Sequence, residues 1–133
     1  MLAVLQYTAR LFLGPDHSAL AEIPHPPPGA EPALWLFVVA CIVNPLFEEL
    51  FVSAYVIESL SRRFGPNVAI HASTLIRMLY HLYQGPFAFV WCGIYGLLAA
   101  HVYARWRCLW PLVVAHAMHD AVGLVFHYGV LPP

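Results

Sequence analysis

The feature that most constrains the fold is a hydrophobic run from Ala33 to Ile57 that carries two adjacent acids, Glu48 and Glu49. An ionised carboxylate inside a bilayer is strongly disfavoured unless it faces a polar cavity or a partner. Ionisable residues in a membrane segment therefore indicate a functional site. The sequence predicts that the two glutamates meet other polar groups inside a helical bundle.

The composition supports a membrane protein. Hydrophobic residues make up 61% of the 133 residues, and charged residues make up only 10%, against roughly 25% in ordinary soluble domains. The net charge of -1 shows no basic surplus, so we expect no nucleic-acid partner. The three cysteines, Cys41, Cys92 and Cys108, show no CxxC spacing and indicate neither a disulfide framework nor a cysteine metal site.

The hydrophobic segments predict an all-α fold, a polytopic membrane helix bundle with four core transmembrane helices and a short N-terminal apolar helix. Residues 1–32 are expected to form that short helix and a Pro-rich loop, and residues 33–133 the core. About 20 residues are needed to cross a bilayer, and the second and third segments are a little short. The four segments are approximately 33–60, 67–83, 87–103 and 110–128.

The arginines predict the orientation. Arg62 and Arg63 lie between the first two core segments, and Arg105 and Arg107 lie between the last two. With four spans, both connections fall on the same side, and positive loops are retained in the cytoplasm. We therefore expect a multi-pass protein with both arginine loops cytoplasmic.

Polar residues recur at helical spacing on three of the four segments. Such stripes must face one another or a shared wet cavity. They can serve as hydrogen-bonding contacts alone, but their ionisable types favour a working site. The third segment, with Gly93 and Gly96, is expected to be scaffold, and His101 and His119 are expected to lie outside the site. The stripes are Asn44, Glu48 and Tyr55; His71, Thr74, Arg77 and His81; and His116, Asp120, Gly123 and His127.

These residue types suit hydrolysis by activated water. A carboxylate and a histidine that share a water molecule can remove its proton, and neighbouring donors can stabilise the oxyanion that forms when it attacks a carbonyl. The sequence contains no GxSxG and no HExxH. It therefore indicates neither a serine nucleophile nor a zincin-like metal site.

The order of these residues resembles the CPBP intramembrane proteases, which include the type II CAAX prenyl proteases and bacteriocin-processing or immunity proteins. The family pattern is EExxFR on one helix, FxxxH on the next, and HxxxN or HxxxD on a later one. The resemblance covers about residues 33–130. It implies that Glu48 and His81 activate water, that His116 and Asp120 bind the oxyanion or place the substrate, and that Glu49 supports them.

Three positions depart from the family pattern. Val52 and Ser53 stand where EExxFR has phenylalanine and arginine, and Arg77 stands where FxxxH has phenylalanine. We predict that Arg77 supplies the missing positive charge from the second core helix. A Glu49–Arg77 pair would keep one acid ionised and leave Glu48 for catalysis.

Three hypotheses remain open from the sequence. The first is a peptidase in a bacterial cell membrane that cleaves a membrane-associated or prenylated peptide without a cofactor. In the second, a divalent metal such as zinc is held by Glu48, His81, His116 and Asp120. The third is a non-catalytic immunity or scaffold protein that sequesters a peptide or helix. The oligomeric state is not indicated.

Overall fold

The computed structural model describes residues 34–127, and the side chains of residues 34–122. This part of the chain is helical and contains no strand, which confirms the all-α prediction. The predicted N-terminal helix and Pro-rich loop, residues 1–32, lie outside it. The elements are α2 (Leu34–Glu48), the π-helical turn η2 (Glu49–Tyr55), α3 (Val56–Phe64), α4 (Pro66–Tyr80), the 3-10 turn η3 (Leu82–Gln84), α5 (Pro86–Trp106) and α6 (Trp110–His127).

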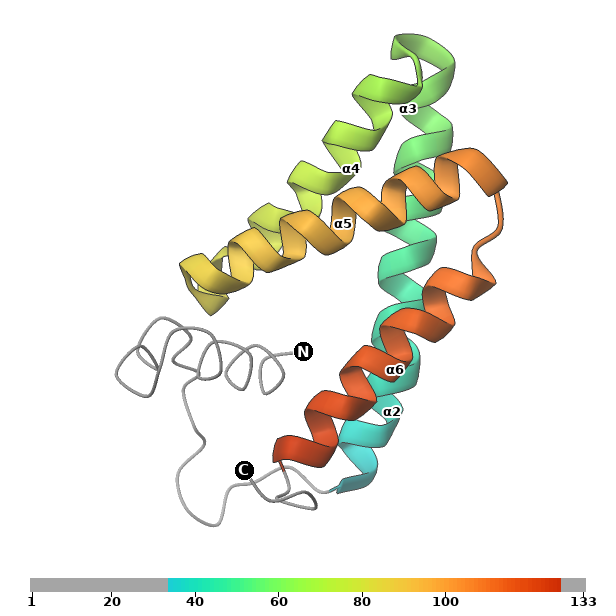
Figure 1. Cartoon of the computed structure of the whole chain (residues 1–133). Coiled ribbons are helices and arrows are strands. Elements are labelled where there is room, and N and C mark those ends of the chain that lie inside the picture. Colours follow the sequence, from blue (N-terminus) through green and yellow to red (C-terminus); the bar gives the residue numbers. More distant parts are fainter. Residues whose placement is uncertain (1–33, 128–133) are drawn as a thin grey trace.

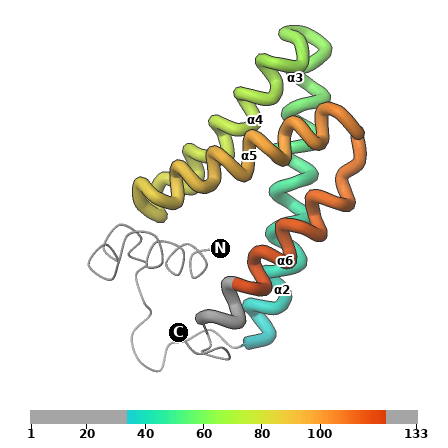
Figure 2. Tube along the Cα trace, in the orientation of Figure 1, coloured from blue at the N-terminus to red at the C-terminus, as the bar shows by residue number. Residues whose placement is uncertain are grey.

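One long helix organises the others. α2, η2 and α3 follow one another without a break from Leu34 to Phe64. α6 packs beside α2, α4 packs beside α3, and α5 runs along α4 (Figure 1). The trace in Figure 2 shows the same arrangement, with α4 leading away from the α3 end of the long helix and α5 running back along α4 toward it. η2 contacts α4 and α5, so the segment that follows Glu48 lies where the helices meet.

Two connections share a Gly-Pro sequence that explains their sharp turns. Gly65 and Gly85 have φ angles of +84° and +94°, which side chains with a Cβ rarely adopt. Pro66 and Pro86 then occupy the first helical positions of α4 and α5, where a missing N–H costs nothing and the fixed φ suits a helix. α4 itself ends at Tyr80, three residues before the predicted end of the second segment, and the 3-10 turn η3 continues the chain to Gln84.

The apolar core lies between α3, α4, α5 and the start of α6. Most of the outer surface is also apolar, with large exposed side chains such as Trp35, Phe47, Ile94 and Leu98. An apolar exterior of this extent suits hydrocarbon rather than water. The core cluster consists of Ile57, Ala69, Ile70, Ala99, Ala100, Tyr103 and Leu112.

Two of the described helices are long and apolar enough to cross a bilayer. The helix from Leu34 to Phe64 has 31 residues and contains an 18-residue stretch with a mean hydropathy of 1.8. α5 has 21 residues, more than the sequence predicts, and contains an 18-residue stretch with a mean hydropathy of 1.6. α4 has 15 residues and α6 has 18, and their crossing of the membrane stays a prediction.

The arginine-bearing connections lie at the same end of the structure. Arg107, directly after α5, forms an ion pair with Glu58 of α3, and Glu58 lies one helical turn before Arg62 and Arg63. This placement agrees with two loops on one side of the membrane. Which side is cytoplasmic stays a prediction.

α5 approaches α4 closely through two glycines. A Cβ on Gly93 would lie 2.9 Å from the Met78 Sδ, whereas a Cβ on Gly96 would lie 3.0 Å from the Arg77 Cδ. The end of the Met78 side chain can move aside. Arg77 is 2% exposed, and neighbouring side chains bind its guanidinium. The aliphatic part of the Arg77 side chain therefore cannot move aside as freely as the end of Met78.

The two glycines should respond differently to alanine. Gly93→Ala gains helix propensity at little steric cost, so its melting temperature in detergent should equal or exceed that of the unmodified protein. Gly96→Ala should melt several degrees lower, because overpacking against a fixed side chain costs about 1–3 kcal/mol. Circular dichroism of both variants measures this. Equal melting temperatures would show that Arg77 is not rigidly held.

Candidate active site

The long helix widens into a π-helical turn at the second glutamate. The turn covers Glu49–Tyr55 and begins four residues after Pro45, the proline inside α2. π-helical turns are rare and often occur at functional sites. Because they hold more residues per turn than an α-helix, they shift the following side chains around the axis. Tyr55, expected on the same face as Glu48, instead is 62% exposed and stacks on Phe51.

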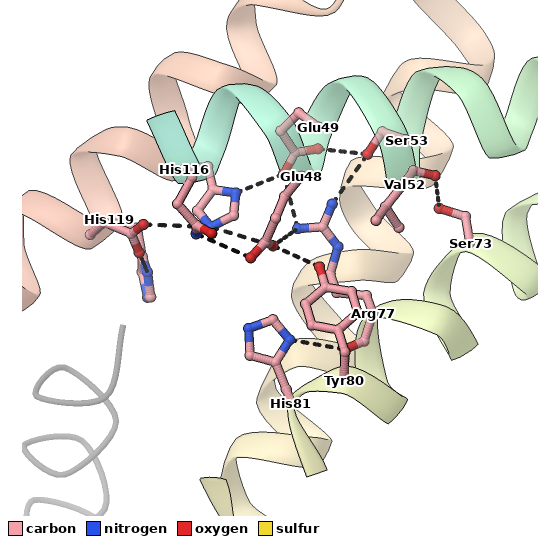
Figure 3. Close-up of polar contacts among 12 residues, drawn as sticks. Glu48, Glu49, Val52, Ser53, Ser73, Arg77, Tyr80, His81, His116 and His119 are labelled. Atoms are coloured by element: carbon pink, nitrogen blue, oxygen red, sulfur yellow. Dashed lines mark hydrogen bonds and ion pairs between the residues drawn. The ribbon is translucent and has the colours of Figure 1, made fainter. Parts of the chain in front are cut away.

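Glu49 is completely buried and fully hydrogen-bonded. Its Oε1 accepts from Arg77 Nη1 at 2.9 Å and contacts His116 Nδ1 at 2.9 Å. Its Oε2 accepts from the Ser53 hydroxyl at 2.6 Å, and Arg77 Nη2 donates to the Ser53 Oγ at 3.3 Å (Figure 3). The predicted Glu49–Arg77 pair is therefore present. With these partners, this carboxylate is poorly placed to bind a water molecule or a substrate.

Glu48 has a different environment one residue earlier. Its Oε1 accepts from Asn44 Nδ2 at 3.1 Å, and its Oε2 accepts from the Tyr80 hydroxyl at 2.6 Å. Arg77 Nη1 lies 3.6 Å from Oε2. The Glu48 side chain is 11% exposed, whereas that of Glu49 is 0% exposed. Glu48 is therefore the carboxylate that an incoming molecule can reach.

His81 is oriented by the end of α4. It lies at φ -96° and ψ 0° between α4 and η3, a sparsely allowed backbone region where active-site residues often occur. Its Nδ1 is 2.9 Å from the carbonyl oxygen of Arg77. A carbonyl only accepts hydrogen bonds, so Nδ1 carries the proton, and the neutral ring has its acceptor at Nε2. The helix end thereby fixes the tautomer that a general base requires.

His116 connects the two glutamates to Asp120. Its Nδ1 donates to the Glu49 carboxylate, and its Nε2 lies 4.0 Å from Glu48 Oε2 and 3.8 Å from Asp120 Oδ2. These two separations are too long for direct hydrogen bonds, and an oxygen atom placed between the groups could bond to both. The structure thus brings together five of the residues predicted for the site, which are Glu48, Glu49, Arg77, His116 and Asp120.

A small cavity joins His81 to this group. The volume open to the centre of a water molecule is about 10 Å³, which suits roughly one water molecule. Its walls come from α4, α5 and α6 and from His81 at the end of α4. They include Arg77, His81, Tyr95, His116 and His119.

Other members of the predicted stripes lie elsewhere. His71 is exposed on α4, and the Thr74 hydroxyl donates to the backbone oxygen of Ile70 instead of to the site. The prediction that these two residues belong to the site was wrong. Equal spacing places residues on one face of a helix, but it does not determine which turns of that helix contact the partner helix. The side chains of Gly123 and His127 lie outside the described residues. His101 is exposed, as expected.

Several residues of the site are not predicted from the sequence. Tyr80 donates a hydrogen bond to Glu48. It lies three residues after Arg77 and directly before His81, and this position on the same helix was a signal that could have predicted it as a site residue. His119 was expected outside the site but lines the cavity, 3.8 Å from Asp120 Oδ1 through its Nδ1. α5 is more than scaffold, because Tyr95 also lines the cavity.

Among the residues that the structure describes, no group of three or more His, Cys, Asp or Glu side chains is arranged to hold a metal ion. A metal held by Glu48, His81, His116 and Asp120 stays a prediction, because the Nδ1 contact of His81 with a backbone carbonyl leaves its Nε2 unengaged.

The comparisons with known proteins identify the family. Residues 30–122 match the family model described as "Type II CAAX prenyl endopeptidase Rce1-like", which covers more than half of the chain. No curated protein and no solved structure matches. The chain therefore belongs to the Rce1-like family of type II CAAX prenyl endopeptidases, a family of membrane proteases.

Proposed function

We propose that this protein is an intramembrane endopeptidase in which Glu48 and His81 activate water for attack on a peptide bond. The observation that supports this most strongly is the unequal use of the adjacent glutamates. Glu49 is saturated by Arg77, Ser53 and His116, whereas Glu48 remains partly exposed beside an imidazole. A general base must be within hydrogen-bond reach of the water that it deprotonates, and of the two glutamates only Glu48 meets this need.

The proposed reaction divides the work among four side chains. Glu48 takes the proton from water, helped by the unprotonated Nε2 of His81, and water attacks the carbonyl carbon. His116, when protonated on both ring nitrogens, donates from Nε2 to the developing oxyanion, and Asp120 positions His116. Glu48 then returns its proton to the leaving nitrogen. Enclosure among apolar helices strengthens these electrostatic interactions relative to water.

We infer that the substrate is a membrane-associated peptide that carries a prenyl group. The family description names prenyl endopeptidases of the CAAX type. The apolar exterior of the helices would allow such a lipid to lie against the protein within the bilayer. The peptide chain would then reach Glu48 from the side on which this residue is exposed.

Replacing the proposed base should abolish cleavage without unfolding the protein. Glu48→Gln keeps the side-chain shape, and its amide can still contact Asn44 and Tyr80. The rate of cleavage of a farnesylated CAAX peptide in liposomes should fall by about 10²- to 10⁴-fold, the typical contribution of a general base. Glu58→Gln, which alters a glutamate paired with Arg107 outside the site, is the matched control. Full activity of Glu48→Gln would contradict the proposal and favour a non-catalytic protein.

Replacing the neighbouring acid should mainly affect stability. Glu49→Gln leaves Arg77 without its charged partner in the interior, and breaking a buried ion pair costs about 3–5 kcal/mol. Thermal unfolding in detergent should therefore show a much lower melting temperature than for Glu48→Gln. If both variants melt at the same temperature as the unmodified protein, the assigned roles of the two glutamates are wrong.

Chelation separates the proposed mechanism from a zinc-dependent version. Because the side chains alone carry the reaction, cleavage by the purified protein should be unchanged in EDTA and in 1,10-phenanthroline. Elemental analysis should find less than one zinc per chain. Loss of activity on chelation, restored by added Zn²⁺, would instead assign a metal to Glu48, His81, His116 or Asp120.

A further inference from the structure

Two residues that line the cavity each carry a buried polar atom that has no hydrogen-bond partner among the described residues. The atoms are the Tyr95 hydroxyl of α5 and the Nε2 of His119 of α6, and both are shielded from solvent. The two rings stack with centroids 6.2 Å apart. Unpartnered buried polar atoms are unfavourable and uncommon in folded proteins. Two of them on residues that line one cavity are the groups available to bind a polar atom there.

The other cavity side chains have less spare bonding capacity. The Arg77 guanidinium bonds Glu49 and Ser53. His81 and His116 each use Nδ1 within the protein. The Nδ1 of His119 faces Asp120 Oδ1 at 3.8 Å, so a proton there would leave its Nε2 as an acceptor in the neutral ring. Trp91 and Cys92 also line the cavity, but the Tyr95 hydroxyl is the neutral donor there whose atom is buried without a hydrogen-bond partner among the described residues.

The position of the cavity suits a substrate oxygen. Its volume of about 10 Å³ has room for roughly one oxygen atom. His116 forms part of its wall and reaches within 4.0 Å of Glu48 Oε2 through Nε2, so the cavity adjoins the proposed site of water attack. The Arg77 guanidinium carbon lies 5.3 Å from the centre of the Tyr95 ring. Its positive charge would attract an oxygen that becomes negative during the reaction.

We propose that Tyr95 is a further catalytic residue whose hydroxyl donates a hydrogen bond to the scissile carbonyl oxygen. This rests on the proposed function. As the water oxygen bonds to the carbonyl carbon, the π electron pair moves to the carbonyl oxygen and a water proton passes to Glu48. The pair then returns, the C–N bond breaks, and the Glu48 proton goes to the leaving nitrogen. Tyr95 keeps its proton throughout. An ionised Asp120 has no proton to donate to the carbonyl oxygen, and Tyr95 supplies this hydrogen bond instead.

Tyr95→Phe tests this role because it removes only the hydroxyl. Loss of one oxyanion donor typically lowers kcat by about 10²- to 10³-fold, and KM for the farnesylated peptide should change by less than about twofold. Since the hydroxyl has no partner among the described residues, its removal should leave the melting temperature unchanged or raise it. Tyr103→Phe, on the same helix, is the control: its hydroxyl bonds Glu58 outside the cavity, and its kcat should be retained.

Glu48→Gln measured in parallel separates the two proposals. If Glu48→Gln is inactive while Tyr95→Phe retains full kcat, the role of Tyr95 is wrong and the proposed function stands. If Glu48→Gln is fully active, the proposed function fails and the role of Tyr95 fails with it. A fall in kcat for Tyr95→Phe that is matched by a large fall in melting temperature would assign a structural role and overturn the inference.

Discussion

The structure depends on one ion pair placed where water is excluded. Arg77 and Glu49 are 2% and 0% exposed and lie 2.9 Å apart, and they join α4 to the π-helical turn of the long helix. A buried charge is tolerated only when it is paired and its remaining hydrogen-bonding groups are satisfied. Ser53 and His116 meet this requirement for Glu49. The pair therefore fixes α4, η2 and α6 relative to one another at the level of the site.

The same interaction makes two adjacent glutamates unequal. Residues next to each other on a helix point about 100° apart, so one carboxylate can face the interior while its neighbour faces an opening. Glu49 takes the interior partners, and Glu48 is left with Asn44 and Tyr80 at the partly exposed edge. His116 then reaches both, since its two ring nitrogens face one glutamate each. The two glutamates thus have different roles because the helix points them in different directions, although they are the same type of residue.

The sequence predicts those features that depend on strong local signals or on costly buried charges. The Gly-Pro connections fix where α4 and α5 begin. Ser53 stands where the family pattern has arginine, so a buried Glu49 needs a cation from another helix, and this comparison with the pattern pointed to Arg77. Tyr55 and His71 were misplaced because helical spacing gives a face but not the turn at which two helices cross, and because the π-helical turn has no clear signature. Tyr95 was missed because its role arises from packing against another helix.

The departures from the family pattern form one coordinated change. Ser53 Oγ lies 3.3 Å from Arg77 Nη2, so a larger, cationic side chain in place of this serine would have to occupy the space of the guanidinium that now serves Glu49. Arg77 in turn needs a small residue opposite its stem, and Gly96 provides it, since a Cβ there would lie 3.0 Å from the Arg77 Cδ. The positive charge thus comes from α4 instead of the long helix, yet reaches the same carboxylate. What the site requires is a cation beside Glu49, and the helix that supplies it can differ when Ser53 and Gly96 make room.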